Sequence, residues 1–197
     1  SIGERQPSFF DKLFSSLKFT LLRTETVDLR RKMAFEINRN PIRYAINYAL
    51  NHLLARPWIR RIIRWLDFLM VSDKTFSNYF EKYKPDAVFL AHLFDDLQIN
   101  MLREAKKRKV PTIGFVNSWD KLTARNIIRL LPDRLLVFNE LVKEEALKHA
   151  DMKPDNIFVI GVPQYDWHVN YRPLPRNEFF SKKKLDPKKK LVVYAPM

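Results

Sequence analysis

The chain has 197 residues, a hydrophobic fraction of 46% and no cysteine. This composition supports one substantial core, and it excludes a disulfide framework, a thiolate metal site and a cysteine nucleophile. Of the net charge of +14, residues 1–70 carry +7, residues 71–170 carry +1 and residues 171–197 carry +6. Two basic ends around a nearly neutral body are typical of a protein that lies near an anionic surface. A nucleic-acid binder would spread its charge over the domain, so we do not expect nucleic acid as a partner.

Residues 1–84 are predicted to be helical and basic. Phe9–Leu22 is amphipathic, and Asn40 followed by Pro41 is typical of a helix start. Pro57 opens a further helix, Trp58–Met70, and Ser72 is expected to cap one that runs to Tyr83. The apolar stripe of Trp58–Met70 contains Ile59, Ile62, Ile63, Leu66, Leu69 and Met70, with Arg60, Arg61 and Arg64 opposite. Two interpretations stay open: the arginines form a solvated face of helices packed on a sheet, or these helices contact a membrane surface.

From Pro85 the hydrophobic period changes, and residues 85–169 are predicted to form a sheet core. Four short apolar strands are expected at 87–91, 112–116, 134–138 and 157–160. Asp95 or Asp96 is expected to cap a helix after the first strand, and Asn139 a helix after the third. Alternation of helices with short strands buried on both faces predicts an α/β fold with a parallel, Rossmann-like sheet. No apolar run is long enough to span a bilayer, and no signal-peptide pattern is present.

The last part of the chain has a different composition. Residues 170–190 are rich in lysine and proline and are predicted to be a basic linker. Residues 191–197 contain the apolar run LVVYA, which is expected to be the first strand of a C-terminal domain. The chain starts at Ser1 and ends just after that run, so we expect it to be a fragment of a longer protein.

Polar side chains gather where the predicted strands end. In an open parallel sheet, ligands bind outside the carboxyl ends of the strands, so these residues are expected to share one edge. They are His92 and Asp95, then Asn117, Ser118, Trp119, Asp120 and Lys121, then Asn139 and Glu140, then Gln164, Tyr165 and Asp166. The pattern favours a binding crevice without specifying a reaction.

Each of these residues also has a structural interpretation. His92 is either a general base, with Asp95 or Asp96 as its partner, or a structural histidine. Asp120 is a base, a hydroxyl ligand or an ordinary turn residue, and Trp119 stacks on a sugar or simply packs. With 3 glycines the chain has no GxGxxG dinucleotide motif, and its four histidines are too scattered to predict a metal site.

Several segments resemble a known family. They are REAKKR at 103–108 leading into VPTIG at 110–114, SWDKLT at 118–123, PDRL at 132–135, NE at 139–140 and GVPQYD at 161–166. Together they resemble the N-terminal domain of bacterial GT-B glycosyltransferase-like proteins of surface-carbohydrate synthesis. These proteins are related in layout to the CDP-glycerol glycerophosphotransferases and the UDP-N-acetylglucosamine 2-epimerases. The chain departs from the usual pattern at Lys121, where the family has Asn, and at 124–126, where ARN replaces SKG.

The resemblance implies two Rossmann-like domains that face each other across a cleft. This chain would be the incomplete N-terminal, acceptor-side half of the GT-B fold, inactive alone, and the nucleotide-sugar would bind mainly to the other domain. His92 or Asp120 would deprotonate an acceptor hydroxyl. The residues expected to bind substrate are Asn117, Ser118, Trp119, Lys121, Arg125, Gln164, Tyr165 and Asp166, with Lys121 and Arg125 facing a phosphate. No metal and no cofactor besides the donor nucleotide-sugar is expected.

Two alternatives stay open for the function. The same fold could transfer glycerol phosphate from CDP-glycerol or epimerise a UDP-sugar, and the donor domain would discriminate between these reactions. A third hypothesis is a non-catalytic module that binds a membrane or a polyanion through the two basic ends. For the enzyme we expect a carbohydrate or lipid-linked acceptor, and a cytoplasmic location with peripheral contact at the inner face of the cell membrane.

Overall fold

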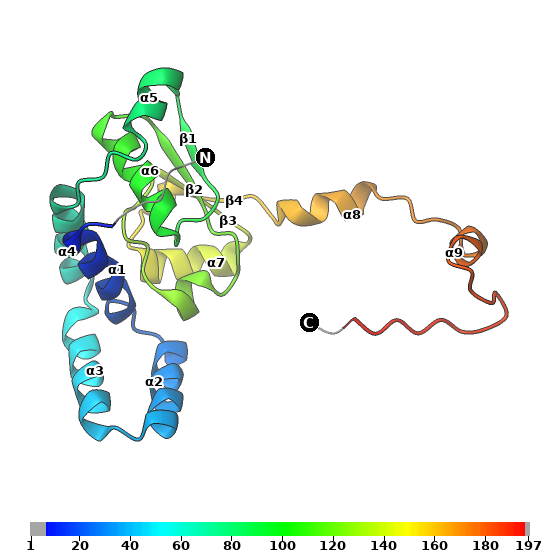
Figure 1. Cartoon of the computed structure of the whole chain (residues 1–197), viewed down its shortest axis with the longest axis horizontal. Helices are drawn as coiled ribbons and strands as arrows, with labels where there is room; N and C mark the ends of the chain where they lie inside the picture. Colours follow the sequence, from blue (N-terminus) through cyan, green and yellow to red (C-terminus); the bar gives the residue numbers. More distant parts are fainter. Residues whose placement is uncertain (1–6, 196–197) are drawn as a thin grey trace. The chain divides into compact units, whose positions relative to one another are not determined.

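The computed structural model describes residues 7–195, apart from the side chain of Arg125 (Figure 1). The chain divides into two units, Ser1–Gly161 and Val162–Met197, which we call unit 1 and unit 2. Unit 1 combines a group of helices with a parallel sheet, so the predicted α/β class is confirmed for this part. Among the described residues, none of the helices has the length and apolar character needed to cross a bilayer.

Five helices precede the sheet. They are α1 (Phe9–Thr20), α2 (Glu25–Asn38), α3 (Pro41–Leu54), α4 (Pro57–Met70) and α5 (Ser77–Tyr83). The Asn40 side chain accepts a hydrogen bond from the Arg43 N–H, which confirms the predicted start of α3. The predicted cap at Ser72 is wrong, because α5 begins at Ser77 after a loop in which Asp73 accepts from the Thr75 N–H. Helix α2 has no buried residue, and Val27 packs against the small core around Leu21 and Leu22.

The sheet has four parallel strands in the order β1-β2-β3-β4. The strands are β1 (Val88–Leu90), β2 (Thr112–Phe115), β3 (Arg134–Val137) and β4 (Ile157–Val159), all within the predicted segments. Helix α6 (Asp96–Lys107) follows β1 and lies against β1 and β2. Helix α7 (Glu140–Glu145) follows β3, continues as the π-helical turn η2 (Ala146–Ala150), and lies against β3 and β4. Asp95 and Asn139 cap these two helices as predicted.

The strands are buried on one face only, which differs from the predicted double burial. Val88, Leu90, Leu135, Val137 and Ile157 are buried in the main core beneath α6 and α7. The other face carries an apolar row in which Phe115, Leu136 and Phe158 are in register on β2, β3 and β4. These three side chains are half-buried or exposed. In the described chain, helices cover only one face of the sheet, so the other face is open to solvent.

Helix α4 is rotated relative to the sequence prediction. Arg60, Arg64 and Asp67 are buried, with exposed fractions of 4%, 7% and 1%, whereas Ile62 and Leu69 are exposed. The interpretation of Arg60 and Arg64 as a solvated face is therefore wrong. The reason is that each charged group has a partner across the tertiary structure, which hydrophobic periodicity along one helix does not reveal. Two residues of the predicted stripe, Ile59 and Ile63, do pack inward, against a small core around Leu21, Leu22 and Ile127.

Asp67 lies at the centre of a buried ion network. It accepts a hydrogen bond from Arg103 of α6, and its two oxygens accept from Arg129 Nε at 2.8 Å and Nη2 at 2.9 Å. The remaining Arg129 nitrogen, Nη1, lies 2.9 Å from Asp11 and 3.0 Å from Asp96. Asp96 also accepts from Lys18 of α1 at 2.9 Å. The network therefore joins α1, α4, α6 and the loop before β3.

Asp151 holds α4 at a second point. It binds Arg60 through two hydrogen bonds of 2.7 and 2.5 Å, and Arg64 through one of 2.6 Å. Arg64 Nε also donates to the carbonyl of Ile128 at 2.9 Å. Burial alone would raise the pKa of the Asp151 carboxyl, but Arg60 and Arg64 hold that pKa below its ordinary value.

The described part of unit 2, up to residue 195, contains short helices. The 3-10 turn η4 (Pro163–Tyr165) leads into α8 (Asp166–Asn170), and α9 (Arg176–Lys182) lies within the predicted linker. The Arg176 guanidinium stacks on the Phe180 ring at 4.0 Å, so the linker is partly ordered by local contacts. Residues 191–195 have no strand partner in the described part of the chain. Their assignment to a C-terminal domain stays a prediction, and its last two residues, 196 and 197, lie outside the described residues.

Replacing Asp67 by asparagine tests the network. We expect D67N to lower the free energy of unfolding by about 3–5 kcal/mol, because the buried Arg103 guanidinium loses its carboxylate partner and Arg129 loses one of its three. Urea denaturation at neutral pH measures this. D86N changes an exposed aspartate just before β1 and serves as the control, with an expected change within about 0.5 kcal/mol. Equal stability of D67N and D86N would contradict the described network.

Acid should weaken unit 1 through Asp96 and Asp151. The pKa of the Asp96 carboxyl is also lowered: burial opposes this, and hydrogen bonds from Ser15 and Lys18 outweigh the burial. Groups with a depressed folded pKa add stability above their unfolded pKa of about 3.9 and lose it as the pH falls through the folded value. We therefore expect the urea midpoint to fall steeply below about pH 4. In D151N this pH dependence should be smaller, and an unchanged dependence would contradict the account.

Candidate functional site

The first candidate site lies where β1 and β2 end. Val88 pairs with Thr112 and Leu90 with Gly114, so the residues that follow these strands emerge side by side. His92 comes two residues after β1, and Asn117 comes two residues after β2. The Asn117 amide and the His92 ring are in contact, with 2.5 Å between Nδ2 and Nδ1. The sheet register thus brings together two residues that are 25 positions apart in the sequence.

These two side chains line a pocket of about 310 Å³. Its lining residues are His92, Phe94, Asp95, Asn117 and Lys121. Lys121 lies over the Phe94 ring, with its Nζ 5.9 Å from the ring centroid. The pocket therefore combines an imidazole, an amide, a cation and an aromatic wall in one place. Phe94 was not predicted from the sequence, because only the polar residues at the strand ends indicated a site and Phe94 is apolar.

The amide of Asn117 controls which nitrogen of His92 carries the proton. With Nδ2 toward the ring, Nδ1 accepts and the proton is on Nε2. In this orientation Asn117 Oδ1 is buried without a hydrogen-bond partner. Turning the amide places Oδ1 against an Nδ1–H group, so the oxygen is satisfied and Nε2 carries a free lone pair. Nε2 can then accept a proton from a hydroxyl in the pocket.

Asp95 and Asp96, the predicted carboxylate partners of His92, bind other groups. Asp95 accepts from the Leu97 N–H at 2.8 Å and caps α6. Asp96 accepts from Ser15 at 2.6 Å and joins the buried ion network. Within residues 7–195 the ring is instead held by Asn117, and the backbone N–H of His92 donates to Gln98 Oε1 at 2.9 Å. The structure therefore favours Asn117 over either aspartate as the partner of the His92 ring, because Asp95 caps α6 and Asp96 belongs to the ion network.

The loop after Asn117 only partly joins this pocket. Lys121 lines it and begins the π-helical turn η1 (Lys121–Arg125). Ser118 donates to Asp120, and both this aspartate and Trp119 are exposed and outside the pocket lining. Trp119 is 74% exposed, so it does not serve as a core residue. The side chain of Arg125 lies outside the described residues.

The remaining predicted substrate residues belong to unit 2. Gln164 and Tyr165 lie in η4, Asp166 begins α8, and all three are exposed. Their role in substrate binding stays a prediction. Gly161, at the end of unit 1, has a φ of 79°, which explains a glycine at the turn between the units.

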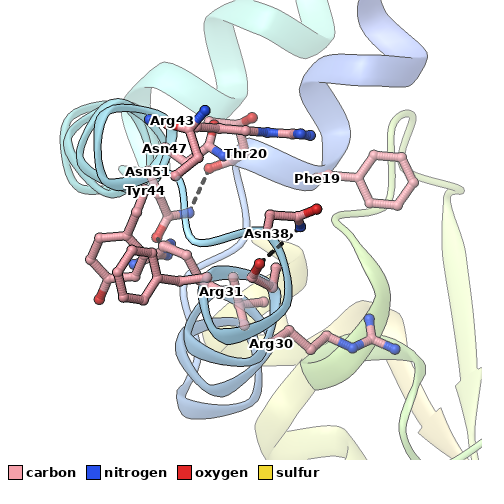
Figure 2. Close-up of a pocket in the computed structure, with 13 residues that line it drawn as sticks. Phe19, Thr20, Arg30, Arg31, Asn38, Arg43, Tyr44, Asn47 and Asn51 are labelled. Atoms are coloured by element: carbon pink, nitrogen blue, oxygen red, sulfur yellow. Dashed lines mark hydrogen bonds between the residues drawn. The ribbon is translucent and has the colours of Figure 1, made fainter.

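A second pocket, of about 320 Å³, lies between α1, α2 and α3 (Figure 2). It is lined by Phe19, Thr20, Val27, Arg30, Arg31, Ala34, Phe35, Asn38, Asn40, Arg43, Tyr44, Asn47 and Asn51. Asn51 closes its base by donating to the carbonyls of Thr20 and Leu22, and it accepts from Arg31 at 2.9 Å. Three arginines and, among the described residues, no carboxylate line this pocket. Arg31 is paired with Asp28 at 3.0 Å and Arg30 donates to the Ala124 carbonyl, so Arg43 is the arginine that best suits an anion here.

A third, more open pocket of about 790 Å³ contains two titratable groups with shifted pKa values. Burial raises the pKa of the Glu145 carboxyl. Burial, aided by the charges of Lys148 and Arg60, lowers the pKa of the His149 ring. Both shifts favour the neutral form. Glu145 and His149 lie one turn apart at the junction of α7 and η2, so local burial on one helix accounts for them without a ligand.

Across the described residues no group of three acidic or histidine side chains is arranged to hold a metal ion. No family model matches the chain, and comparisons with curated proteins and with solved structures return no match.

Proposed function

We propose that the chain is the acceptor-side domain of a GT-B-type glycosyltransferase, which passes a sugar from a nucleotide-sugar to an acceptor hydroxyl. The observation that carries the proposal is the His92–Asn117 contact in a pocket at the carboxyl edge of a parallel sheet. The family resemblance of the segments around this edge supplies the reaction class, and the pocket agrees with it by offering a base beside a cation.

His92 is the base in this proposal, in preference to Asp120. With the Asn117 amide turned from the orientation in which Nδ2 faces the ring, Oδ1 would accept from the Nδ1–H of His92, and Nε2 would then take the proton from the acceptor hydroxyl. The acceptor oxygen then forms a bond to the anomeric carbon of the donor, and the nucleoside diphosphate leaves with the electrons of the broken bond. Asp120 is exposed and bonded to Ser118, outside the pocket, so it lacks the enclosed position of the histidine.

Lys121 supplies positive charge at the same edge. Its ammonium group lies against the Phe94 ring and lines the pocket, where it can attract a phosphate of a lipid-linked acceptor or of the donor. The donor nucleotide-sugar is assigned to a second domain.

The two related reactions are the second candidate. Transfer of glycerol phosphate from CDP-glycerol would use the same base on the same acceptor hydroxyl, and Lys121 would face the transferred phosphate. Epimerisation of a UDP-sugar would need no acceptor in the pocket. Product analysis with CDP-glycerol and UDP-N-acetylglucosamine therefore separates these reactions from sugar transfer.

The test uses the full-length protein and a panel of nucleotide-sugars. We expect H92A to lower kcat about 10²–10⁴-fold, as removal of a general base does. D120A should change kcat less than about threefold, because that carboxylate is outside the pocket. The matched control is H168A, which removes the exposed histidine of α8.

Two results would contradict the base assignment. One is turnover in H92A equal to that in H168A. The other is a large loss in D120A with H92A unaffected, which would transfer the role to the aspartate. If no nucleotide-sugar, CDP-glycerol or UDP-N-acetylglucosamine is turned over by the wild-type protein, the enzymatic proposal fails and the non-catalytic module is favoured.

A further inference from the structure

Helix α4 presents a continuous apolar stripe to solvent. Trp58, Ile62, Trp65 and Leu69 follow the spacing i, i+4, i+7, i+11, which places them on one face of the helix. Trp58 is 57% exposed and Trp65 is 61% exposed. Two tryptophans and two aliphatic residues in one exposed row exceed the scattered apolar residues that are normal on a soluble surface.

This stripe is held outward by the opposite face of the same helix. Arg60 and Arg64 are fixed to Asp151, and Asp67 is fixed to Arg103 and Arg129. Rotating α4 to bury the tryptophans would break these contacts and leave unpaired charges in the core. The exposure of this stripe is therefore fixed by the ion pairs on the buried side of α4.

Helix α3 carries a second exposed apolar row. Its inner side carries Asn51, which caps the end of α1, and Leu54, which packs on the small core. Its outer side exposes Ile42, Ile46, Leu50 and Leu53, again at i, i+4, i+8 and i+11. In Figure 1, α3 and α4 follow one another at the edge of unit 1 away from the sheet. We call these eight residues on α3 and α4 the outer face.

The charge around the outer face has a single sign. No aspartate or glutamate occurs between Glu36 and Asp67 in the sequence. The same segment holds six arginines, of which Arg60 and Arg64 are buried with Asp151. The other four, Arg39, Arg43, Arg56 and Arg61, are exposed. An apolar face with exposed arginines and no carboxylate is complementary to a surface that is apolar inside and anionic at its boundary.

From this combination we infer that the outer face docks on an anionic lipid bilayer. Tryptophan rings prefer the boundary between lipid headgroups and acyl chains, so Trp58 and Trp65 would insert there with Ile62 and Leu69 beneath them. The exposed arginines would contact headgroup phosphates. A second copy of the chain is a poorer occupant, because it would oppose arginines to arginines across the interface. The inference does not rest on glycosyl transfer.

The pocket beside α3 adds a place for one lipid phosphate. Figure 2 shows Arg43 and Arg30 on opposite sides of it, with Asn38 between them. No carboxylate lines the pocket, and its walls include Phe35 and Tyr44. Guanidinium and amide groups above an apolar wall suit the phosphate and glycerol region of a lipid.

Flotation with vesicles tests the docking. We expect the 197-residue chain to bind vesicles of phosphatidylcholine mixed with phosphatidylglycerol, to bind pure phosphatidylcholine weakly, and to lose binding as sodium chloride is raised. W58S/W65S should lower the partition coefficient at least about tenfold. R43Q/R61Q should lower it about fivefold for each arginine, and only for the anionic vesicles. Circular dichroism with a thermal melt confirms that each variant is folded.

Matched substitutions outside the outer face distinguish docking through that face from non-specific adsorption of any exposed tryptophan or lysine. W167S removes an exposed tryptophan of unit 2, and K107Q/K153Q removes two exposed lysines of unit 1. Both should bind like the wild type within about twofold. Equal binding of folded W58S/W65S and W167S would overturn the proposal, as would equal binding to neutral and anionic vesicles. A wild-type dimer that W58S/W65S converts to a monomer, without vesicle binding, would instead assign the outer face to a second copy.

Discussion

Two buried aspartates determine how the helices of unit 1 meet its sheet. Asp67 takes hydrogen bonds from Arg103 and Arg129, and Asp151 takes them from Arg60 and Arg64. Four guanidinium groups in a core are strongly unfavourable alone, and their cost is offset only where carboxylates with good geometry meet them. Because Asp67 lies on α4 and Asp151 binds two arginines of α4, the rotation of that helix is fixed by ion pairs as well as by apolar contacts. The position of α1 follows through Asp11 and Lys18.

This arrangement has consequences on both sides of the unit. The outer face is apolar because the charged side of α4 is used inside. The sheet keeps one apolar face open, with the rings of Phe89 and Phe115 stacked at 6.4 Å and the ring of Phe138 edge-on to Phe115 at 5.4 Å. The candidate pocket lies at the edge between these layers, where β1 and β2 end. In the two proposals together, the outer face would hold the protein at a bilayer, and the base at the sheet edge would act there on a lipid-linked acceptor.

Local signals in the sequence predicted much of this fold. The strands were identified because short apolar runs between turn residues have few other interpretations, and the starts of α3, α6 and α7 because Asn40, Asp95 and Asn139 are good caps. The rotation of α4 was not predicted, since its apolar stripe suggested that the arginines face solvent and only the distant partners Asp151, Arg103 and Arg129 decide which side is buried. Asn117 was predicted at the site, but its contact with His92 depends on the β1–β2 register. Phe94 had no sequence signal, and the aspartates expected beside His92 are held by the α6 cap and the ion network.

The rotation of α4 is the claim on which the ion network and the outer face both depend. It is measured by acrylamide quenching of Trp65 fluorescence in a protein whose other three tryptophans, Trp58, Trp119 and Trp167, are changed to phenylalanine. The account predicts quenching close to that of a free indole, because the Trp65 side chain is 61% exposed. Strong protection of Trp65 from acrylamide in the folded monomer would contradict it, and would place the tryptophan inside and the arginines of α4 outside.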